Sequence, residues 1–360
     1  MLPGAGGAGA SFAVLPWRAW GSAEARAAWD ALSARASTPN PFFETWYLLP
    51  GLGRFDPYGR VQIAALMQDA APLGLLPLQR ARRYGRHPLP HLAVWLHANA
   101  FLGAPLVAEG AEEAFWEALL DWADRHAGTA AFLHLAALPL DAALTEALQA
   151  VGARQRRQVE LVHREERAML SSPLGPAAYL EHALPGKKRK ELRRQQARLA
   201  EQGELRVVRR DDETGIGLWI ETFLALEALG WKGAAGSALA CAGETAGLFR
   251  ESMAAAAARG CLERLSLELD GRPIAMLATL ISPPGAFSYK TSFDQRYARF
   301  SPGVRWADSC AAPDHPMIDS LWRERRGIGR FSIAIGGAAR RALFGRIVSY
   351  ELSRNPQGLG

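Results

Sequence analysis

The stretch CLERLSLELDGRPIAMLATLI, residues 261–281, decides the fold of the C-terminal half. Two runs of strand-forming residues flank Asp270-Gly271, a dipeptide typical of the tight turn in a β-hairpin. The second run is apolar on both faces, which indicates a strand that is covered on both sides. AFSYKTSF, residues 286–293, predicts the next strand. These three segments therefore predict an antiparallel meander.

The segments around this meander complete an α+β pattern. LRVVR at 205–209 predicts a strand, and helical periodicity follows at 212–230 and 244–260. After the meander, a helix is expected to begin at Ser301 and a last strand at 328–336. A strand, two helices, three strands, a helix and a strand make an α+β unit with meander character.

The N-terminal half predicts a similar mixture of elements. We expect helices at 22–36, 41–49, 111–126 and 141–152, and strands at 61–67, 73–81, 92–96, 131–138 and 158–164. A helical segment at 177–203, broken at Pro185-Gly186, connects the halves. The predicted fold class is therefore α+β, or mixed α/β, with one domain at 1–170 and a second at 171–360.

Composition is that of a globular protein with a full core. Of the 360 residues, 49% are hydrophobic and 22% are charged, and the formal net charge is +6. The three cysteines are far apart and in no CxxC spacing, which argues against a disulfide framework and a thiolate metal site. No apolar run reaches 18 residues, and the N-terminus does not resemble a secretory signal. We expect a cytoplasmic protein without a metal.

The best local signal for a ligand is Ser301-Pro302-Gly303. Serine is a favoured helix N-cap and proline is favoured at the first helical position. A helix N-terminus attracts anions, and Gly303 would permit close approach of a pyrophosphate flanked by Arg299 and Arg305. The alternative is an ordinary capped helix.

The strand at 286–293 has one polar face. Simple alternation places Phe287, Tyr289, Thr291 and Phe293 on one side, and Ser288, Lys290, Ser292 and Asp294 on the other. A polar face beside a covered strand is costly unless it lines a cleft. The alternative is a sheet edge with one solvated face.

Glu227 lies near the middle of an apolar helical arc. At 100° per residue that arc consists of Ile216, Trp219, Ile220, Phe223, Leu224 and Leu226. Burial there would raise the pKa of the carboxyl, which suits a general base. The alternative is a carboxylate near the helix end that snorkels or pairs with Lys232.

The segment KKRKELRRQQARL, residues 187–199, carries seven Lys and Arg residues. Lys187, Lys190, Arg194 and Arg198 share one face. They could hold an anionic substrate, a tRNA or a lipid head group. A solvated linker helix is the alternative, and the lack of interleaved aromatic residues argues against nucleic acid as principal partner.

Four segments together resemble a known family. KKRKELRRQQARLAEQGEL, LEALGWKGAAGSAL, LELDGRPIAMLATL and YKTSFDQRYARFSPGV occur in that order within 187–304. In this order they are similar to the GNAT acetyltransferase-like family associated with bacterial cellulose and exopolysaccharide loci. That group is related to the FemAB-like peptidoglycan aminoacyltransferases. The resemblance implies two tandem GNAT domains, with the active site in the second.

The resemblance also implies a reaction and its residues. An amine of a small molecule or envelope sugar precursor would attack acetyl-CoA or another acyl-CoA directly. A backbone N–H of strand 286–293 would steady the oxyanion. Glu227 or Asp294 would be the base and Tyr289 the acid. The remaining assignments are substrate contacts at Trp231, Lys232 and Lys290, and cofactor contacts at Arg299, Ser301, Pro302, Gly303, Val304 and Arg305.

Two other functions stay open at this point. A FemAB-like enzyme would take its aminoacyl group from a tRNA, held by the basic helix. A non-catalytic accessory protein would keep the fold without the chemistry, which the partial match to the usual GNAT pyrophosphate loop Q/RxxGxG/A allows. Peripheral contact with a membrane is compatible with all three.

Overall fold

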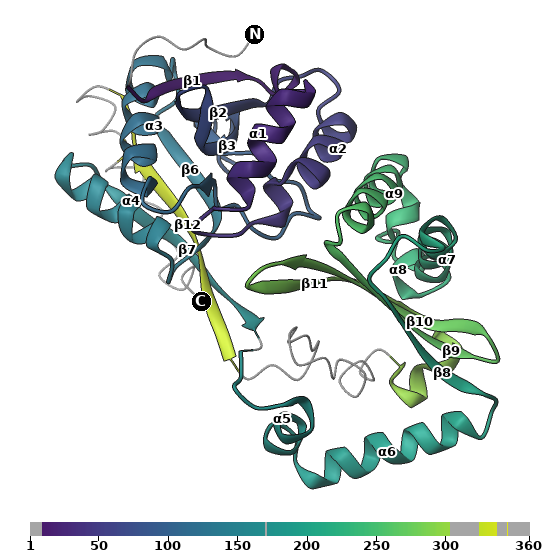
Figure 1. Cartoon of the computed structure of the whole chain (residues 1–360). Helices are drawn as coiled ribbons and strands as arrows, with labels where there is room; N and C mark the ends of the chain where they lie inside the picture. Colours follow the sequence, from purple (N-terminus) through teal and green to yellow (C-terminus); the bar gives the residue numbers. More distant parts are fainter. Residues whose placement is uncertain (1–8, 170, 303–323, 337–343, 345–360) are drawn as a thin grey trace. The chain divides into compact units, whose positions relative to one another are not determined.

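The structure is a computed structural model that describes residues 9–169, 171–302, 324–336 and 344. It divides into two compact units, shown in Figure 1. Unit 1 comprises the described residues of Met1–Arg167 and Arg326–Gly360, and unit 2 those of Ala168–Arg325. Both are antiparallel-dominated sheets with flanking helices, which confirms the predicted mixed α+β class.

Unit 1 is built on a sheet with the strand order β1-β2-β3-β4-β6-β12-β7, and β5 pairs with β3. Its strands are β1 (Ser11–Pro16), β2 (Gln62–Gln68), β3 (Ala71–Ala81), β4 (His91–Val94), β5 (Leu106–Val107), β6 (Phe132–Pro139), β7 (Val159–Met169) and β12 (Glu324–Ala334). Its helices are α1 (Ala23–Ser33), α2 (Thr45–Phe55), α3 (Glu112–His126) and α4 (Ala143–Arg154). The pair β4–β6 is parallel, in contrast to the antiparallel pairs β1–β2, β2–β3 and β6–β12.

Large aromatic side chains fill the core of unit 1. Trp20, Trp29, Phe115 and Trp116 are essentially inaccessible to solvent. The predicted cap of the first helix is present, because the Ser22 hydroxyl accepts a hydrogen bond from the backbone N–H of the third residue along. Local capping and aromatic burial thus account for the helix that the sequence predicts here.

The last described strand, β12, lies in the sheet of unit 1. We expected the segment 328–336 to complete the second half, and this expectation about its location is wrong. Phe331 and Ile333 are buried, and they pair with Leu135 and Leu133 of β6. Burying both apolar residues on an inner strand stabilises this arrangement more than a position at a sheet edge would.

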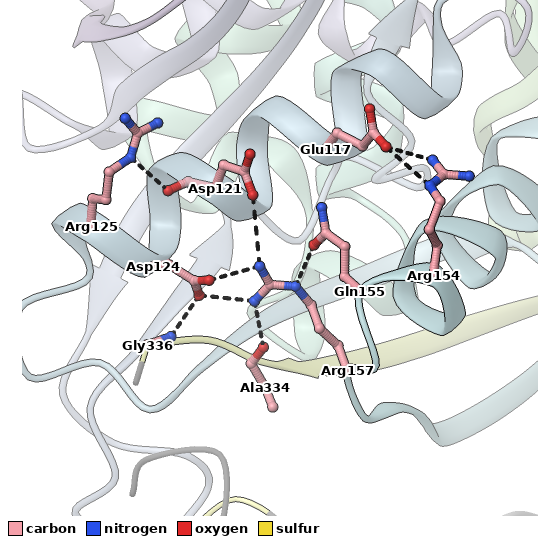
Figure 2. A network of polar contacts seen from close by, with 9 residues as sticks. All are labelled: Glu117, Asp121, Asp124, Arg125, Arg154, Gln155, Arg157, Ala334 and Gly336. Carbon is pink, nitrogen blue, oxygen red and sulfur yellow. Dashed lines mark hydrogen bonds and ion pairs between the residues drawn. The ribbon is translucent and has the colours of Figure 1, made fainter. Parts of the chain in front are cut away.

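A polar network fixes the end of β12 (Figure 2). Asp124 of α3 accepts hydrogen bonds from the backbone N–H of Gly336, at 2.7 Å, and from both terminal nitrogens of Arg157, at 2.8 and 2.7 Å. Arg157 also donates to the carbonyl of Ala334, at 3.4 Å. A bidentate pair with a buried guanidinium therefore links α3, the residues after α4 and the C-terminal strand.

Unit 2 contains a four-stranded antiparallel sheet with the order β11-β10-β9-β8. Its strands are β8 (Leu205–Arg210), β9 (Leu262–Leu269), β10 (Arg272–Ser282) and β11 (Gly285–Phe293). Its helices are α5 (Pro176–Ala183), α6 (Gly186–Ala200), α7 (Ile216–Ala228), α8 (Trp231–Ala234), α9 (Gly243–Ala258) and the 3-10 turns η3 (Leu239–Cys241) and η4 (Gln295–Phe300). Asp270 and Gly271 both have positive φ, at 51° and 73°, which confirms the predicted tight turn.

The two faces of this sheet are covered differently. One face presents Leu265, Leu267 and Leu277 to Leu199 of α6 and Phe300 of η4. The opposite face carries α7 and α9, as Figure 1 shows. There the indole N–H of Trp219 donates to Ser266 at 3.1 Å. We call this second side the α7/α9 face.

Candidate functional site

A β-bulge interrupts β11 at Tyr289. Ser288 lies opposite Thr279 of β10, whereas Lys290 lies opposite Ala278, so Tyr289 is an extra residue in the ladder. The ring of Tyr289 is buried and stacks on Phe249 of α9, at 6.4 Å between centroids. The bulge therefore brings Tyr289 and Lys290 to the same α7/α9 face.

Because of the bulge, the side chains of β11 do not alternate as the sequence predicts. An extra residue inverts every later side chain of a strand. Lys290 and Ser292 now share the face of Ala278, while Ser288 and Thr291 point to the opposite side. The expected polar face is thus split at Tyr289, because simple alternation has no means of anticipating a bulge.

Glu227 is buried, with 4% of its surface exposed. One carboxylate oxygen accepts from the Lys232 ammonium at 2.9 Å, and the other accepts from the backbone N–H of Leu239 at 2.7 Å. Lys232 also donates to the carbonyl of Thr291 at 2.8 Å. The alternative of pairing with Lys232 is confirmed. Both carboxylate oxygens are engaged, and the ion pair ties the end of α7 to η3 and to the edge strand β11.

Lys290 lies near this ion pair. Burial lowers the pKa of its ammonium, Glu227 raises that pKa, and Lys232 lowers it further. The ammonium stands 5.6 Å from the ring centroid of Tyr289, in cation–π range. The net effect favours the neutral amine relative to an ordinary lysine.

Ser292, which the sequence analysis placed only on the polar side of its strand, and Arg264, which it did not consider, are two further residues of this face. The hydroxyl of Ser292 is buried, at 4% exposure, and has no hydrogen-bond partner among the residues that the structure describes. Arg264 is also buried and occupies the same cross-strand row as Ala278 and Lys290. Only the long-range register assembles this row, so no local sequence signal could have found it.

Asp294 lies directly after β11 and caps η4. Its carboxylate accepts from the backbone N–H of Arg296 at 2.9 Å and forms an ion pair with the Arg296 guanidinium at 2.6 Å. The hydrogen bond from the Arg296 side chain lowers the pKa of this carboxyl, and the backbone bond lowers it further. Asp294 is therefore an ionised carboxylate near the end of the bulged strand.

The predicted anion site is described in part. The guanidinium of Arg299 lies 4.7 Å above the ring of Phe300. Ser301 ends η4 with φ at 50°, and its backbone N–H donates to Ala298, so it does not have the extended conformation of a typical N-cap. Pro302 is buried. Gly303, Val304 and Arg305 lie outside the described residues, as does the helix expected there.

Trp231 and Leu229 stand on the surface at the start of α8. They are 57% and 83% exposed, although neighbouring Lys232 is tied inward to Glu227. Gly233 fits closely against α7, because a Cβ there would lie 1.8 Å from a backbone oxygen of that helix. A rigid frame thus presents a large aromatic side chain beside the ion pair.

Within the described ranges, no cluster of three His, Cys, Asp or Glu residues could hold a metal ion. None of the described helices has the length and apolar character needed to cross a bilayer.

Comparison with known proteins gives a domain-family match that covers most of unit 2. Residues 186–321 match the family model described as acetyltransferase (GNAT) domain. The crystal structure of FemX superposes with a TM-score of 0.50 and 13% identity, covering 90% of this chain and 98% of that one. A conserved protein of unknown function from Bacteroides thetaiotaomicron VPI-5482 gives 0.50 and 13%, covering 86% and 97%. No curated protein sequence matches the chain.

Proposed function

We propose that this chain is an acyl-CoA-dependent N-acyltransferase whose site lies on the α7/α9 face, beside β11. The acceptor would be an amine of a small molecule or of an envelope sugar precursor, and the site would belong to the second domain predicted at 171–360. The observation that carries the proposal is the bulge at Tyr289, on the fourth strand of a sheet within the segment that matches the GNAT domain. A bulge interrupts the hydrogen bonding between two strands, so a backbone N–H there could bind the thioester carbonyl of an acyl-CoA.

The reaction would be direct transfer. The amine nitrogen attacks the thioester carbonyl, a C–N bond forms, the C–S bond breaks, and the amine loses the proton that the departing thiolate needs. A backbone N–H at the bulge would hydrogen bond to the oxyanion. The buried hydroxyl of Tyr289 would donate the proton to the thiolate.

The base remains to be chosen between Glu227 and Asp294. The ion pair of Glu227 is buried, and displacing Lys232 from it is costly. Asp294 pairs instead with a largely exposed arginine, and such pairs contribute little. The Arg296 pair lowers the pKa of Asp294, so this carboxylate becomes the stronger base only when Arg296 is displaced. We propose that substrate binding displaces Arg296, that Asp294 then accepts the proton, and that Glu227 positions Lys232.

Substrate contacts follow from the same geometry. Lys290 and the hydroxyl of Ser292, which has no partner among the described residues, would position polar groups of the acceptor on the α7/α9 face. Trp231 and Lys232 would contact the acceptor at the edge of β11. Arg299, Ser301 and Pro302, with Gly303, Val304 and Arg305, remain the proposed pyrophosphate contacts.

The test is release of free CoA thiol from acetyl-CoA and longer acyl-CoAs with a panel of amines and amino sugars. Tyr289→Phe should lower kcat by about 10²–10⁴-fold. The stacking on Phe249 is retained in this variant, so its stability should change little. Tyr58→Phe is the matched control, because Tyr58 is exposed in unit 1. Unchanged turnover in Tyr289→Phe would refute the role of the tyrosine.

The second candidate is FemAB-like transfer of an aminoacyl group from a tRNA. The fold likeness to FemX, which spans nearly all of both chains, favours it. Tight binding of aminoacyl-tRNA with a steep salt dependence, together with no binding of any acyl-CoA, would select this function. Detectable turnover with either donor would exclude a third function, a non-catalytic accessory role in polysaccharide synthesis.

A further inference from the structure

Helix α6 concentrates the positive charge of the chain. Its 15 residues contain one carboxylate, Glu191, and seven cations: Lys187, Lys188, Arg189, Lys190, Arg193, Arg194 and Arg198. The helix therefore has a formal net charge of +6, seven cations less one carboxylate. The whole chain also has a net charge of +6, so the rest of the chain is formally neutral.

The cations gather on the exposed side of the helix. Leu199 is buried in the unit 2 core and Leu192 is half-buried on the same side. At 100° per residue, the opposite side holds five exposed cations: Lys187, Lys190, Arg193, Arg194 and Arg198. We call these five residues the α6 cationic face. The side chain of Ala197, also exposed, lies among them and leaves the face free of bulky apolar groups.

This charge is not neutralised within the part of the chain that the structure describes. Glu191 pairs with Arg194, at 2.7 Å between Oε1 and the guanidinium. The other four residues of the α6 cationic face have no carboxylate within ion-pair distance among the described residues. A rigid helix about 22 Å long thus presents a row of like charges whose mutual repulsion a polyanionic partner would relieve.

We propose that the α6 cationic face docks this chain on an anionic lipid bilayer, with phospholipid head-group phosphates as the ligand. The face runs the length of a 15-residue helix and carries one sign of charge, which complements the negative surface of such a membrane. Each Lys or Arg near that surface strengthens binding by roughly fivefold. Aromatic platforms for unpaired bases are absent from the α6 cationic face, which sets it apart from single-stranded nucleic-acid sites. Apolar side chains for insertion are also absent, so the binding is electrostatic and reversible.

The test is co-sedimentation of the full chain with vesicles of phosphatidylcholine alone and of phosphatidylcholine mixed with phosphatidylglycerol. We expect binding to the mixed vesicles that is at least tenfold tighter than to neutral ones. Raising the ionic strength from about 0.1 M to about 1 M should abolish it, because the screening length falls from about 10 Å to about 3 Å. The measurement needs no catalysis, so it is independent of the proposed transferase activity.

Two triple variants locate the surface. The first variant combines Lys187→Glu, Lys190→Glu and Arg198→Glu. It leaves the Glu191–Arg194 pair intact and should weaken vesicle binding more than 100-fold. The control Arg26→Glu, Arg82→Glu and Arg272→Glu changes exposed arginines elsewhere and alters net charge equally, so it should retain most of the binding. Circular dichroism confirms that each variant is folded, and a milder Lys187→Gln and Lys190→Gln variant should lose binding in proportion.

Three results would overturn the proposal. The first is equal binding to neutral and anionic vesicles, or none to either. The second is an equal loss in the control variant, which would attribute binding to net charge alone. The third is tRNA that binds through the α6 cationic face and displaces the vesicles, which would assign the surface to nucleic acid.

Discussion

Lowering the pH to about 5 should destabilise unit 1 through His134. This side chain lies on β6 and faces Ser332 of β12, with 3.1 Å between Nδ1 and Oγ. The rings of His91 and Tyr84 approach it to 6.0 and 5.2 Å. Burial lowers the pKa of His134 from 6.5 to about 4, and the nearby charges of His91 and Arg330 act in the same direction.

The sign of the effect follows from proton binding. Between about pH 6.5 and pH 4 the unfolded chain binds a proton at this residue that the folded chain does not. The stability that depends on a neutral His134 is fully present above pH 6.5 and is lost as the pH falls toward 4. The loss is about 2 kcal/mol at pH 5 and about 3 kcal/mol once the pH is below 4. Burial also lowers the pKa of His91, which adds a loss of the same sign.

The assay is urea unfolding at about pH 7.5 and pH 5, followed by tryptophan fluorescence. Seven of the eleven tryptophans precede residue 167, so the signal reports mainly on unit 1. At about pH 7.5 His134→Phe should be less stable than the unmodified chain, because it leaves Ser332 without its partner. Between the two pH values, the free energy of unfolding of His134→Phe should fall by about 2 kcal/mol less than that of the unmodified chain.

The control is His182→Phe, which replaces an exposed histidine and should leave the pH dependence unchanged. If the unmodified chain and His134→Phe lose equal stability between the two pH values, His134 is not held neutral and the reasoning fails.

Two further predictions concern packing. Asp124→Asn leaves the buried Arg157 guanidinium with only the exposed Asp121 carboxylate, 3.9 Å away, and it should cost about 3 kcal/mol in urea unfolding; a loss below about 1 kcal/mol would contradict the network. Gly233→Ala should destabilise by about 1–3 kcal/mol, because its Cβ meets a backbone oxygen. Gly217→Ala adds a methyl group into open space on α7 and should raise the stability by up to about 1 kcal/mol. If thermal unfolding shows Gly233→Ala to be more stable than Gly217→Ala, the close packing of Gly233 against α7 is refuted.

The features that the sequence predicts well are local ones. Asp270-Gly271 adopts the expected turn because both residues tolerate positive φ. The predicted helices at 212–230 and 244–260 appear as α7 and α9, since their periodicity and ends depend on neighbouring residues. Burial of Glu227 follows from its place on the apolar arc of α7.

The features that the sequence predicts poorly depend on how strands pair with one another in the sheet. The bulge at Tyr289 arises from the register between β10 and β11, and strand propensity is the same with or without it. The segment of β12 has the pattern of a strand in either half, but it lies between β6 and β7, and its paired residues in β6 are almost 200 residues earlier. Consecutive strands usually neighbour one another, so the usual rule points to the wrong sheet here.

Calorimetric titration with acetyl-CoA and longer acyl-CoAs is the direct test of the proposed cofactor site. We expect micromolar binding of at least one acyl-CoA by the unmodified chain. Gly303→Glu should abolish that binding, because it places a carboxylate where the pyrophosphate is proposed to lie. Gly217→Ala serves as the glycine control and should bind normally. If the folded chain binds none of the acyl-CoAs tested, it is not an acyl-CoA-dependent transferase.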